Sequence, residues 1–365
     1  MIVVAKIGTS SITDEEGTIN EEAVGAFCRE VAAVRAEGHS VVAVTSGAIA
    51  AGLPALNLGG ARRPRDAETL QAVSAVGQSR LMRVYDRTFA ELGLITGQVL
   101  LAPLDFGVRQ QYLHARTTIR RLLELGVIPV VNENDAIADD EIRFGDNDRL
   151  AALVAHLIDA DLLVLLTDAP GVLTADPRLD PSASLIEEIV EVDHTLEALA
   201  GGAGTARGSG GMASKIAAAK IAAWSGVRAV IASASRDAVV RAAINQEPGI
   251  GTVVQPRDRR LPARKLWIAF AVGARGIVTV DDGARTALTE RNRSLLPAGV
   301  IKVEGRFVAD DAVELAGPDG KVFAKGIVRA SADVLARVAG HNTADLPDGV
   351  PHEVVHRDDL VVLPS

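Results

Sequence analysis

Short runs of apolar, β-branched residues alternate with longer amphipathic stretches over the first two thirds of the chain, and this alternation restricts the possible folds most strongly. The runs are apolar throughout, as expected for strands that are buried on both faces of a sheet. Strand–helix–strand alternation predicts an α/β fold with three α/β/α layers and a mostly parallel sheet. The predicted strands are Ile2–Ile7, Val41–Thr45, Val127–Val131, Leu162–Thr167 and Val227–Ile231.

Helical periodicity fills the stretches between these strands, and several predicted helices are followed by a glycine that suits a left-handed C-cap. In sheets of this kind ligands bind beyond the carboxyl ends of the strands, so we expect functional residues in the loops there. The predicted helices are Glu21–Ala36, Ala67–Leu92, Thr117–Leu125, Asp148–Ile158 and Ala213–Trp224, and the C-cap glycines are Gly38, Gly93, Gly126 and Gly226.

The pattern changes near residue 255, where a charged, proline-containing stretch is typical of a linker. Turn signals then separate short strands, which indicates a small β-rich domain. We therefore predict a catalytic α/β domain at 1–254, a linker at 255–272 and a small β-rich domain at 273–365. The strands predicted in that last domain are Ile277–Val280, Val300–Glu304, Ala312–Leu315, Val322–Val328 and Val354–Leu363.

Charge and composition exclude several classes of protein. The 365 residues include 38 Lys and Arg against 47 Asp and Glu, a net charge of −9, which disfavours general binding to nucleic acid. One cysteine, Cys28, excludes an intramolecular disulfide and a cysteine zinc cluster, and we expect it to be a buried small hydrophobe. The N-terminus has no secretory signature and no apolar run approaches ~20 residues, so we expect a soluble, cytoplasmic protein with no membrane contact.

Two loops have the composition of phosphate sites. Lys6 and Gly8 close the first predicted strand among hydroxyl residues, and offer a cation with exposed backbone N–H groups. A glycine-rich loop, 201–211, runs into a helix whose first turn holds Lys215, where a cation opposes the helix dipole and a bound anion would explain it. The alternatives are a solvated strand-to-loop turn for the first loop and a flexible surface loop for the second.

Amide, hydroxyl and carboxylate side chains gather in three other places after predicted strands. Ser46 follows the second strand and could cap a helix instead of binding a ligand. The other polar residues are Asn132, Asn134 and Asp135 after the third strand, and Asn147 and Asp148 further on, all of which are also common in turns and caps. Two lysines, a phosphate-binding loop and these polar clusters suit phosphoryl transfer. Mg²⁺ is expected on the nucleotide phosphates, and no residue spacing predicts a protein cage for a metal.

Several motifs in these loops together resemble the glutamate 5-kinases of the amino acid kinase family, over nearly the whole chain. The C-terminal part, from about Gly273, is similar to a PUA domain. The motifs that carry the resemblance are Lys6-Ile7-Gly8-Thr9-Ser10, Val44 to Gly52, Ala75-Val76-Gly77-Gln78, Val131 to Asp135, Gly145 to Asp148, Leu166-Thr167-Asp168, Thr174 to Arg178 and Gly210-Gly211-Met212. One departure is Leu173, which stands where tyrosine is common.

The resemblance implies ATP-dependent phosphorylation of the L-glutamate side-chain carboxylate, giving γ-glutamyl phosphate and ADP in the first step of proline synthesis. It implies that Lys6 and Lys215 contact the transferred phosphoryl group and that Asp148 organises the two lysines. The implied glutamate-binding residues are Ser46, Asn132, Asn134, Asp135 and Asn147. The implied ATP-binding residues are Lys6, Gly8, Thr167, Asp168, Ser209, Gly210, Gly211, Met212, Ala213, Ser214 and Lys215.

The family also implies feedback inhibition by proline, a homo-oligomer (dimer or tetramer) and a transient handover of the acyl phosphate to the reductase that consumes it. For the C-terminal domain we favour a structural role that stabilises or regulates the catalytic domain. Two alternative functions remain at this point. One is another amino acid kinase, acting on aspartate, N-acetylglutamate or UMP. The other is an RNA-binding protein, which the C-terminal charge disfavours, because residues 266–365 hold 11 Lys and Arg against 14 Asp and Glu.

Overall fold

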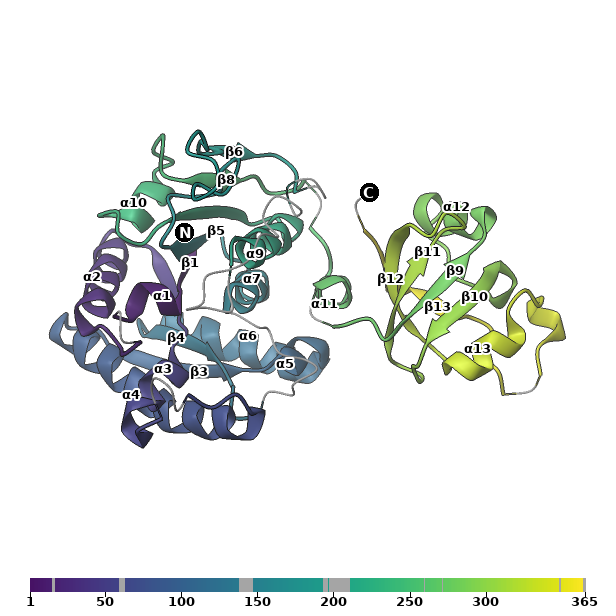
Figure 1. Ribbon diagram of the computed structural model, residues 1–365, viewed down its shortest axis with the longest axis horizontal. Coiled ribbons are helices and arrows are strands. Elements are labelled where there is room, and N and C mark those ends of the chain that lie inside the picture. The colour runs from purple at the N-terminus through teal and green to yellow at the C-terminus, as the bar shows by residue number, and fades with distance from the viewer. Residues whose placement is uncertain are drawn as a thin grey trace. The chain divides into compact units, whose positions relative to one another are not determined.

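The computed structural model describes residues 1–14, 17–58, 63–137, 147–192, 196, 211–258, 260–270, 272–347 and 349–363. The chain divides into two compact units, Met1–Arg260 and Leu261–Ser365 (Figure 1). Residues 255–258 and 260, which sequence analysis assigned to a linker, belong to the first unit. Another part of that stretch forms helix α11 (Ala263–Phe270), which packs on two strands of the second unit.

The described part of the first unit contains an eight-stranded sheet in the order β3-β4-β2-β1-β5-β7-β8-β6. Neighbouring strands are parallel except β7 and β8, which are antiparallel. The strands are β1 (Ile2–Ile7), β2 (Ser40–Val44), β3 (Thr96–Leu101), β4 (Ile128–Glu133), β5 (Leu162–Thr167), β6 (Glu188–Ile189), β7 (Arg228–Ser233) and β8 (Thr252–Val254).

Helices cover both faces of this sheet, so the predicted three-layer fold is confirmed. The contacts place α2 (Glu21–Ala36), α4 (Ala67–Glu91) and α10 (Val239–Ile244) on one face, and α6 (Arg109–Glu124), α7 (Asn147–Leu157) and α9 (Met212–Trp224) on the other. Short helices α1 (Thr9–Ile12), α3 (Ala48–Gly52) and α5 (Pro103–Gly107) fill connections. No helix among the described residues is long and apolar enough to cross a membrane.

Most predicted elements lie where the apolar pattern indicated. The bounds of β1, β5 and α2 are those predicted, and the four predicted C-cap glycines all have positive φ. Helix α6 begins at Arg109, eight residues before the predicted start, because polar residues fill its first two turns. The strand β3 was not predicted; it lies at the edge of the sheet and is only partly buried, so its sequence lacks a continuous apolar run.

The second unit is built on a five-stranded sheet in the order β10-β9-β11-β12-β13. Its apolar core includes Val278, Leu315, Phe323 and Leu335. All five strands predicted for this region are present, together with three helices that the prediction did not include. The elements are α11, β9 (Gly276–Val280), α12 (Asp282–Glu290), β10 (Val300–Gly305), β11 (Ala312–Ala316), β12 (Val322–Val328), α13 (Ala332–Val338) and β13 (Val355–Val362).

Candidate active site

Strand β1 directs Lys6 toward the face of the sheet that α7 and α9 cover. Alternate residues of a strand point to opposite faces, and Ala5 and Ile7 belong to the core under α2. Lys6 is therefore on the other face, where its Nζ lies 2.5 Å from Asp148 Oδ1. Only 3% of the Lys6 side chain is exposed. A buried ammonium group needs a counter-charge, and Asp148 supplies it.

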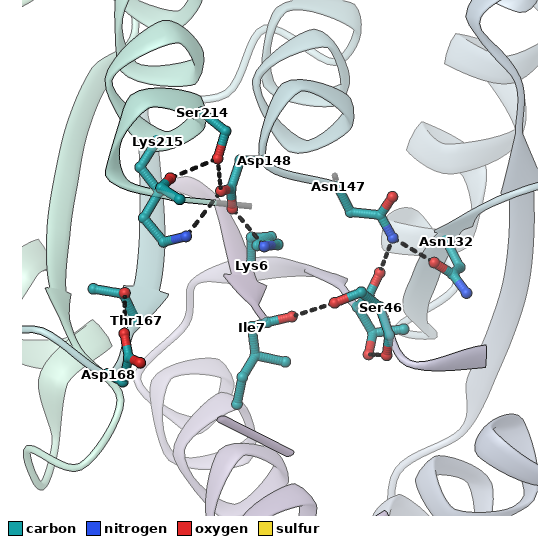
Figure 2. A network of polar contacts seen from close by, with 12 residues as sticks. Lys6, Ile7, Ser46, Asn132, Asn147, Asp148, Thr167, Asp168, Ser214 and Lys215 are labelled. Carbon is teal, nitrogen blue, oxygen red and sulfur yellow. Dashed lines mark hydrogen bonds and ion pairs between the residues drawn. The ribbon is translucent and has the colours of Figure 1, made fainter. Parts of the chain in front are cut away.

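Helices α7 and α9 bring Asp148 and Lys215 together from segments far apart in the sequence. Lys215 Nζ lies 3.0 Å from Asp148 Oδ2, so each carboxylate oxygen contacts one lysine. Figure 2 shows the carboxylate between the two ammonium groups. Burial raises the pKa of Asp148, but the charges of Lys6 and Lys215 outweigh it and lower that pKa to about 2. Asp148 is therefore an anion at neutral pH and fixes the two lysines.

The sequence suggested that a bound anion explains a lysine in the first turn of α9. The structure gives a partner within the protein, because Lys215 pairs with Asp148. Ser214 adds a hydroxyl that lies 3.0 Å from Asp148 Oδ2 and 2.8 Å from the carbonyl oxygen of Gly211. Four side chains from β1, α7 and α9 thus form one polar cluster at the carboxyl edge of the sheet.

A chain of side-chain amides extends from α7 to α4 beside this cluster. Asn147 Nδ2 donates to the carbonyl oxygen of Thr45 and to Asn132 Oδ1, both at 2.5 Å. Asn132 Nδ2 in turn donates to Gln78 Oε1 at 2.7 Å, and Gln78 Nε2 donates to Gln98 Oε1 at 3.3 Å. Both amide hydrogens of Asn147 are therefore engaged within the protein, which leaves Asn147 Oδ1 as its acceptor.

Gln78 belongs to one of the motifs that carry the resemblance but was not among the predicted site residues. Its position depends on Gly77 and Gly52, which let α3 and α4 approach closely. A Cβ on Gly77 would lie 1.7 Å from the carbonyl oxygen of Ala48, and a Cβ on Gly52 would lie 2.1 Å from that of Val73. This close packing of α4 brings Gln78 within reach of β4. A glutamine after a glycine in a helix is the only signal in the sequence.

The remaining predicted substrate residues lie on either side of the amide chain. Asn134 and Asp135 line a cavity of about 300 Å³, together with Gln78 and Gln98. Ser46 does not cap a helix, because Gly47, in the left-handed conformation, is the N-cap of α3. The Ser46 hydroxyl instead donates to the carbonyl oxygen of Ile7 at 3.4 Å. In Figure 2, Ser46 after β2, Asn132 of β4 and Asn147 at the start of α7 lie near one another.

The predicted nucleotide residues lie at the carboxyl ends of β1 and β5 and at the start of α9. Thr167 Oγ1 donates to Asp168 Oδ1 at 3.0 Å, and both residues line a groove of about 720 Å³ beside α2. Gly8 follows β1, and a Cβ there would lie 3.5 Å from Lys6 Nζ. Gly211 is the N-cap of α9, and Met212, Ala213 and Ser214 begin that helix. Ser209 and Gly210 lie outside the described residues.

Two ammonium groups on one carboxylate form a cationic cluster that suits an anion with dispersed negative charge. Both oxygens of Asp148 contact ammonium groups, and among the described residues no three His, Cys, Asp or Glu side chains are grouped to hold an ion.

Comparison with known proteins identifies the family. The profile of the amino acid kinase family matches residues 1–233, and that of the PUA domain matches residues 276–350. A protein named Glutamate 5-kinase from Pelobacter propionicus is 43% identical over 99% of this chain and 97% of that protein. One from Burkholderia cenocepacia is 44% identical with the same coverage, and one from Caldanaerobacter subterraneus is 43% identical over 100% of this chain and 98% of its own.

Two solved structures share the fold at low sequence identity. One is the T. acidophilum isopentenyl phosphate kinase in a product complex, which has a TM-score of 0.51 and 19% identity, and covers 70% of this chain and 100% of its own. Carbamate kinase from Giardia lamblia bound to AMP-PNP has a TM-score of 0.51 and 16% identity, with 70% and 98% coverage. The chain therefore belongs to the glutamate 5-kinase family of amino acid kinases and carries a C-terminal PUA domain.

Proposed function

We propose that this protein transfers the γ-phosphoryl group of ATP to the side-chain carboxylate of L-glutamate, which yields γ-glutamyl phosphate and ADP. The observation that carries the proposal is the buried carboxylate of Asp148, which holds the ammonium groups of Lys6 and Lys215 together. The relatives named Glutamate 5-kinase, similar over their whole length, support glutamate as the substrate.

The reaction requires electrostatic stabilisation rather than proton transfer. A glutamate side chain has a reference pKa of ~4.3, so the nucleophile is already ionised at neutral pH and no general base is needed. The main obstacle is repulsion between the attacking carboxylate and the phosphoryl oxygens. Lys6 and Lys215 counter that repulsion, and Asp148 keeps both lysines oriented so that little reorganisation is needed during transfer.

Glutamate would bind on the side of the amide chain. Because both amide hydrogens of Asn147 are engaged within the protein, its Oδ1 accepts a hydrogen bond from the ammonium group of the substrate. The carboxylate of Asp135 supplies a negative charge for the same ammonium group. Asn132 acts by orienting Asn147, while Ser46 and Asn134 complete the polar wall. Recognition of an ammonium group favours a free amino acid over an N-acylated one, because acylation removes that charge.

ATP would bind at Gly8, at Thr167 and Asp168, and at the start of α9, where the first backbone N–H groups of the helix, at Met212 and Ala213, lie near the Lys215 side chain. The same stretch continues to Ser209 and Gly210. Mg²⁺ accompanies the nucleotide, since it is bound largely by phosphate oxygens in such enzymes. We assign no protein ligand to the Mg²⁺ ion, because both carboxylate oxygens of Asp148 already contact lysine ammonium groups.

The remaining family properties are part of the same proposal. They are a cytoplasmic location, assembly into a homo-oligomer, feedback inhibition by proline and transient handover of the acyl phosphate to a reductase. Chemistry supports the handover, because an acyl phosphate hydrolyses readily in water and direct transfer limits that loss.

Hydroxylamine trapping tests the reaction and the substrate together. The protein is incubated with ATP, Mg²⁺ and L-glutamate, and the acyl phosphate is captured as a hydroxamate while ADP release is followed. L-Aspartate and N-acetyl-L-glutamate serve as controls. Hydroxamate from L-glutamate alone supports the proposal, whereas a folded sample that yields hydroxamate from a control substrate only, or from none, overturns it.

The Lys215→Ala variant tests the role of the lysine in this reaction. We expect kcat to fall by about 10² or more while the KM for glutamate changes little, because the lysine's interaction strengthens as charge shifts during transfer. An unchanged kcat with a greatly raised KM would instead assign Lys215 to ground-state binding.

A further inference from the structure

The two helices that carry Asp148 and Lys215 both end beside the segment that leaves the first unit. This exit segment comprises residues 255–258 and 260, between β8 and the start of the second unit. Helices α7 and α9 pack against each other, and their first turns meet at Asp148 (Figure 1). Their opposite ends therefore lie near one another, on the far side from the reaction.

Arg257 of the exit segment holds the end of α9. Its backbone N–H donates to the carbonyl oxygen of Ala223 at 2.9 Å, in the last turn of the helix. Its guanidinium carbon lies 4.6 Å from the ring centre of Trp224, the last residue of α9, and the group also pairs with Glu191. A cation on an aromatic face, combined with a backbone hydrogen bond, fixes both the position and the rotation of this helix end.

Arg260 holds the end of α7 in a similar way. It donates to the carbonyl oxygen of His156 at 2.7 Å and pairs with Asp159, the second residue after the helix. Asp159 also pairs with Arg116 and Arg120 of α6, so three guanidinium groups converge on one carboxylate. The end of α7 is thus tied to both α6 and the exit segment.

The charges suit these helix ends. Carbonyl groups at a helix C-terminus carry partial negative charge, which cations stabilise. His156 does not supply that cation, because burial, followed by repulsion from Arg260, lowers its pKa to about 4 and leaves it neutral at pH 7. Arg260 therefore provides a positive charge in the last turn of α7 that the helix itself lacks.

A displacement at these ends would be felt at the reaction site. With a rise of ~1.5 Å per residue, α7 spans about 16 Å and α9 about 20 Å. Most residues of both helices are buried, including those from Leu150 to Leu157 and from Ile216 to Trp224 except Ala217. Packed helices move as rigid bodies, so an axial shift at the far end changes the separation of Lys215 and Asp148.

We propose that Arg257 and Arg260 are positioning residues, which set the axial positions of α9 and α7 and so keep Lys215 in register with Asp148. The expected loss of kcat rests on the proposed function, whereas the expected displacement of Lys215 relative to Asp148 does not. The exit segment is, on this view, a structural part of the kinase unit rather than a passive connection.

The test compares Arg257→Ala and Arg260→Ala in the full chain with Arg121→Ala. Arg121 lies on α6 and forms an exposed ion pair with Glu124, so its loss serves as a matched control. For the two test variants we expect kcat to fall about tenfold while the KM for glutamate stays within about twofold, because small misplacements of catalytic groups lower the rate sharply. Arg260→Lys, which retains a charged donor, should recover part of kcat.

A second measurement reads the geometry without activity. Acetic anhydride labels accessible lysines, and mass spectrometry reports the labelling of Lys215, which is 6% exposed in the intact protein. Labelling of Lys215 should rise at least threefold in the folded test variants and not in Arg121→Ala. Unchanged labelling and a kcat equal to that of Arg121→Ala would overturn the inference. If the wild-type protein has no kinase activity but labelling of Lys215 still rises in the two test variants, only the proposed function is overturned.

Discussion

The Asp148→Asn substitution probes the buried cluster most directly. Asp148 is fully buried and contacts Lys6 Nζ at 2.5 Å and Lys215 Nζ at 3.0 Å. Asparagine keeps the size and polarity of the side chain but removes its negative charge. Two buried ammonium groups would then face a neutral amide, and their mutual repulsion would no longer be offset.

The expected loss of stability follows from this geometry. Removing one partner of a buried ion pair costs about 3–5 kcal/mol, because the remaining charge stays buried without compensation. For a unit as large as Met1–Arg260, each kcal/mol lowers Tm by roughly 2 °C. We therefore expect the first unit to melt about 6–10 °C lower than in the wild type.

Thermal unfolding followed by circular dichroism measures this shift, with Asp176→Asn as the matched control. Asp176 lies in an exposed loop and pairs with Arg178, so its loss should cost at most about 1 kcal/mol. Inorganic tripolyphosphate provides a second readout. A polyanion that binds between the lysines should stabilise Asp148→Asn more than it stabilises the wild type.

A Tm within 2 °C of the control variant, together with equal stabilisation of variant and wild type by tripolyphosphate, would refute this reasoning. That outcome would mean that the lysines separate or become hydrated without cost when the carboxylate is neutralised. The buried cluster would then not be the element that holds the two cations in place.

Three other expectations follow from the same structure. Gln78→Leu should raise the KM for glutamate about tenfold with kcat and Tm little changed, because the amide chain loses an acceptor; steady-state kinetics that show a kcat effect alone would contradict it. Gly77→Ala should destabilise the protein by about 3 kcal/mol or more in urea unfolding, because the added methyl group would lie 1.7 Å from a backbone oxygen. Gly25→Ala is the control and should be neutral or stabilising, because its methyl group meets only the end of a flexible side chain. The lowered pKa of Asp148 contributes stability that is present above pH ~4 and lost as pH falls toward 2, so acid unfolding should be less steep in Asp148→Asn.

The sequence predicted the central strands and helices well where burial is complete on both faces. The run Leu162–Thr167 has no polar residue before its end, and it forms β5 with those bounds. Prediction was poorest at the margin of the sheet, because β3 alternates small, polar and apolar residues and owes its conformation to pairing with β4. The local pattern of apolar residues reveals a strand through its burial, and a strand at the edge of the sheet is only partly buried.

For the site, residue type and position after a strand were enough to select Lys6, Asp148 and Lys215 as candidates. The alternation along β1 even indicates which face Lys6 occupies. Residue type and spacing did not indicate the partner of Lys215, because Asp148 lies 67 residues earlier in the chain; only the family resemblance implied that Asp148 organises the two lysines. Gln78 was not selected as a candidate either, because its contact with the site is a hydrogen bond to a strand 54 residues away.

The sequence by itself determined the buried central strands and the long helices of this protein, because helix and strand periodicity, glycine caps and buried apolar runs act over a few neighbouring residues. The strand order β2-β1-β5-β7, the axial positions of α7 and α9, and the attachment of Arg257 and Arg260 to their ends were decided only by the tertiary structure. The physical reason is that ion pairs, close helix packing and amide orientation depend on distances between segments remote in the chain. Local preferences do not specify those distances; the packing of a common core does.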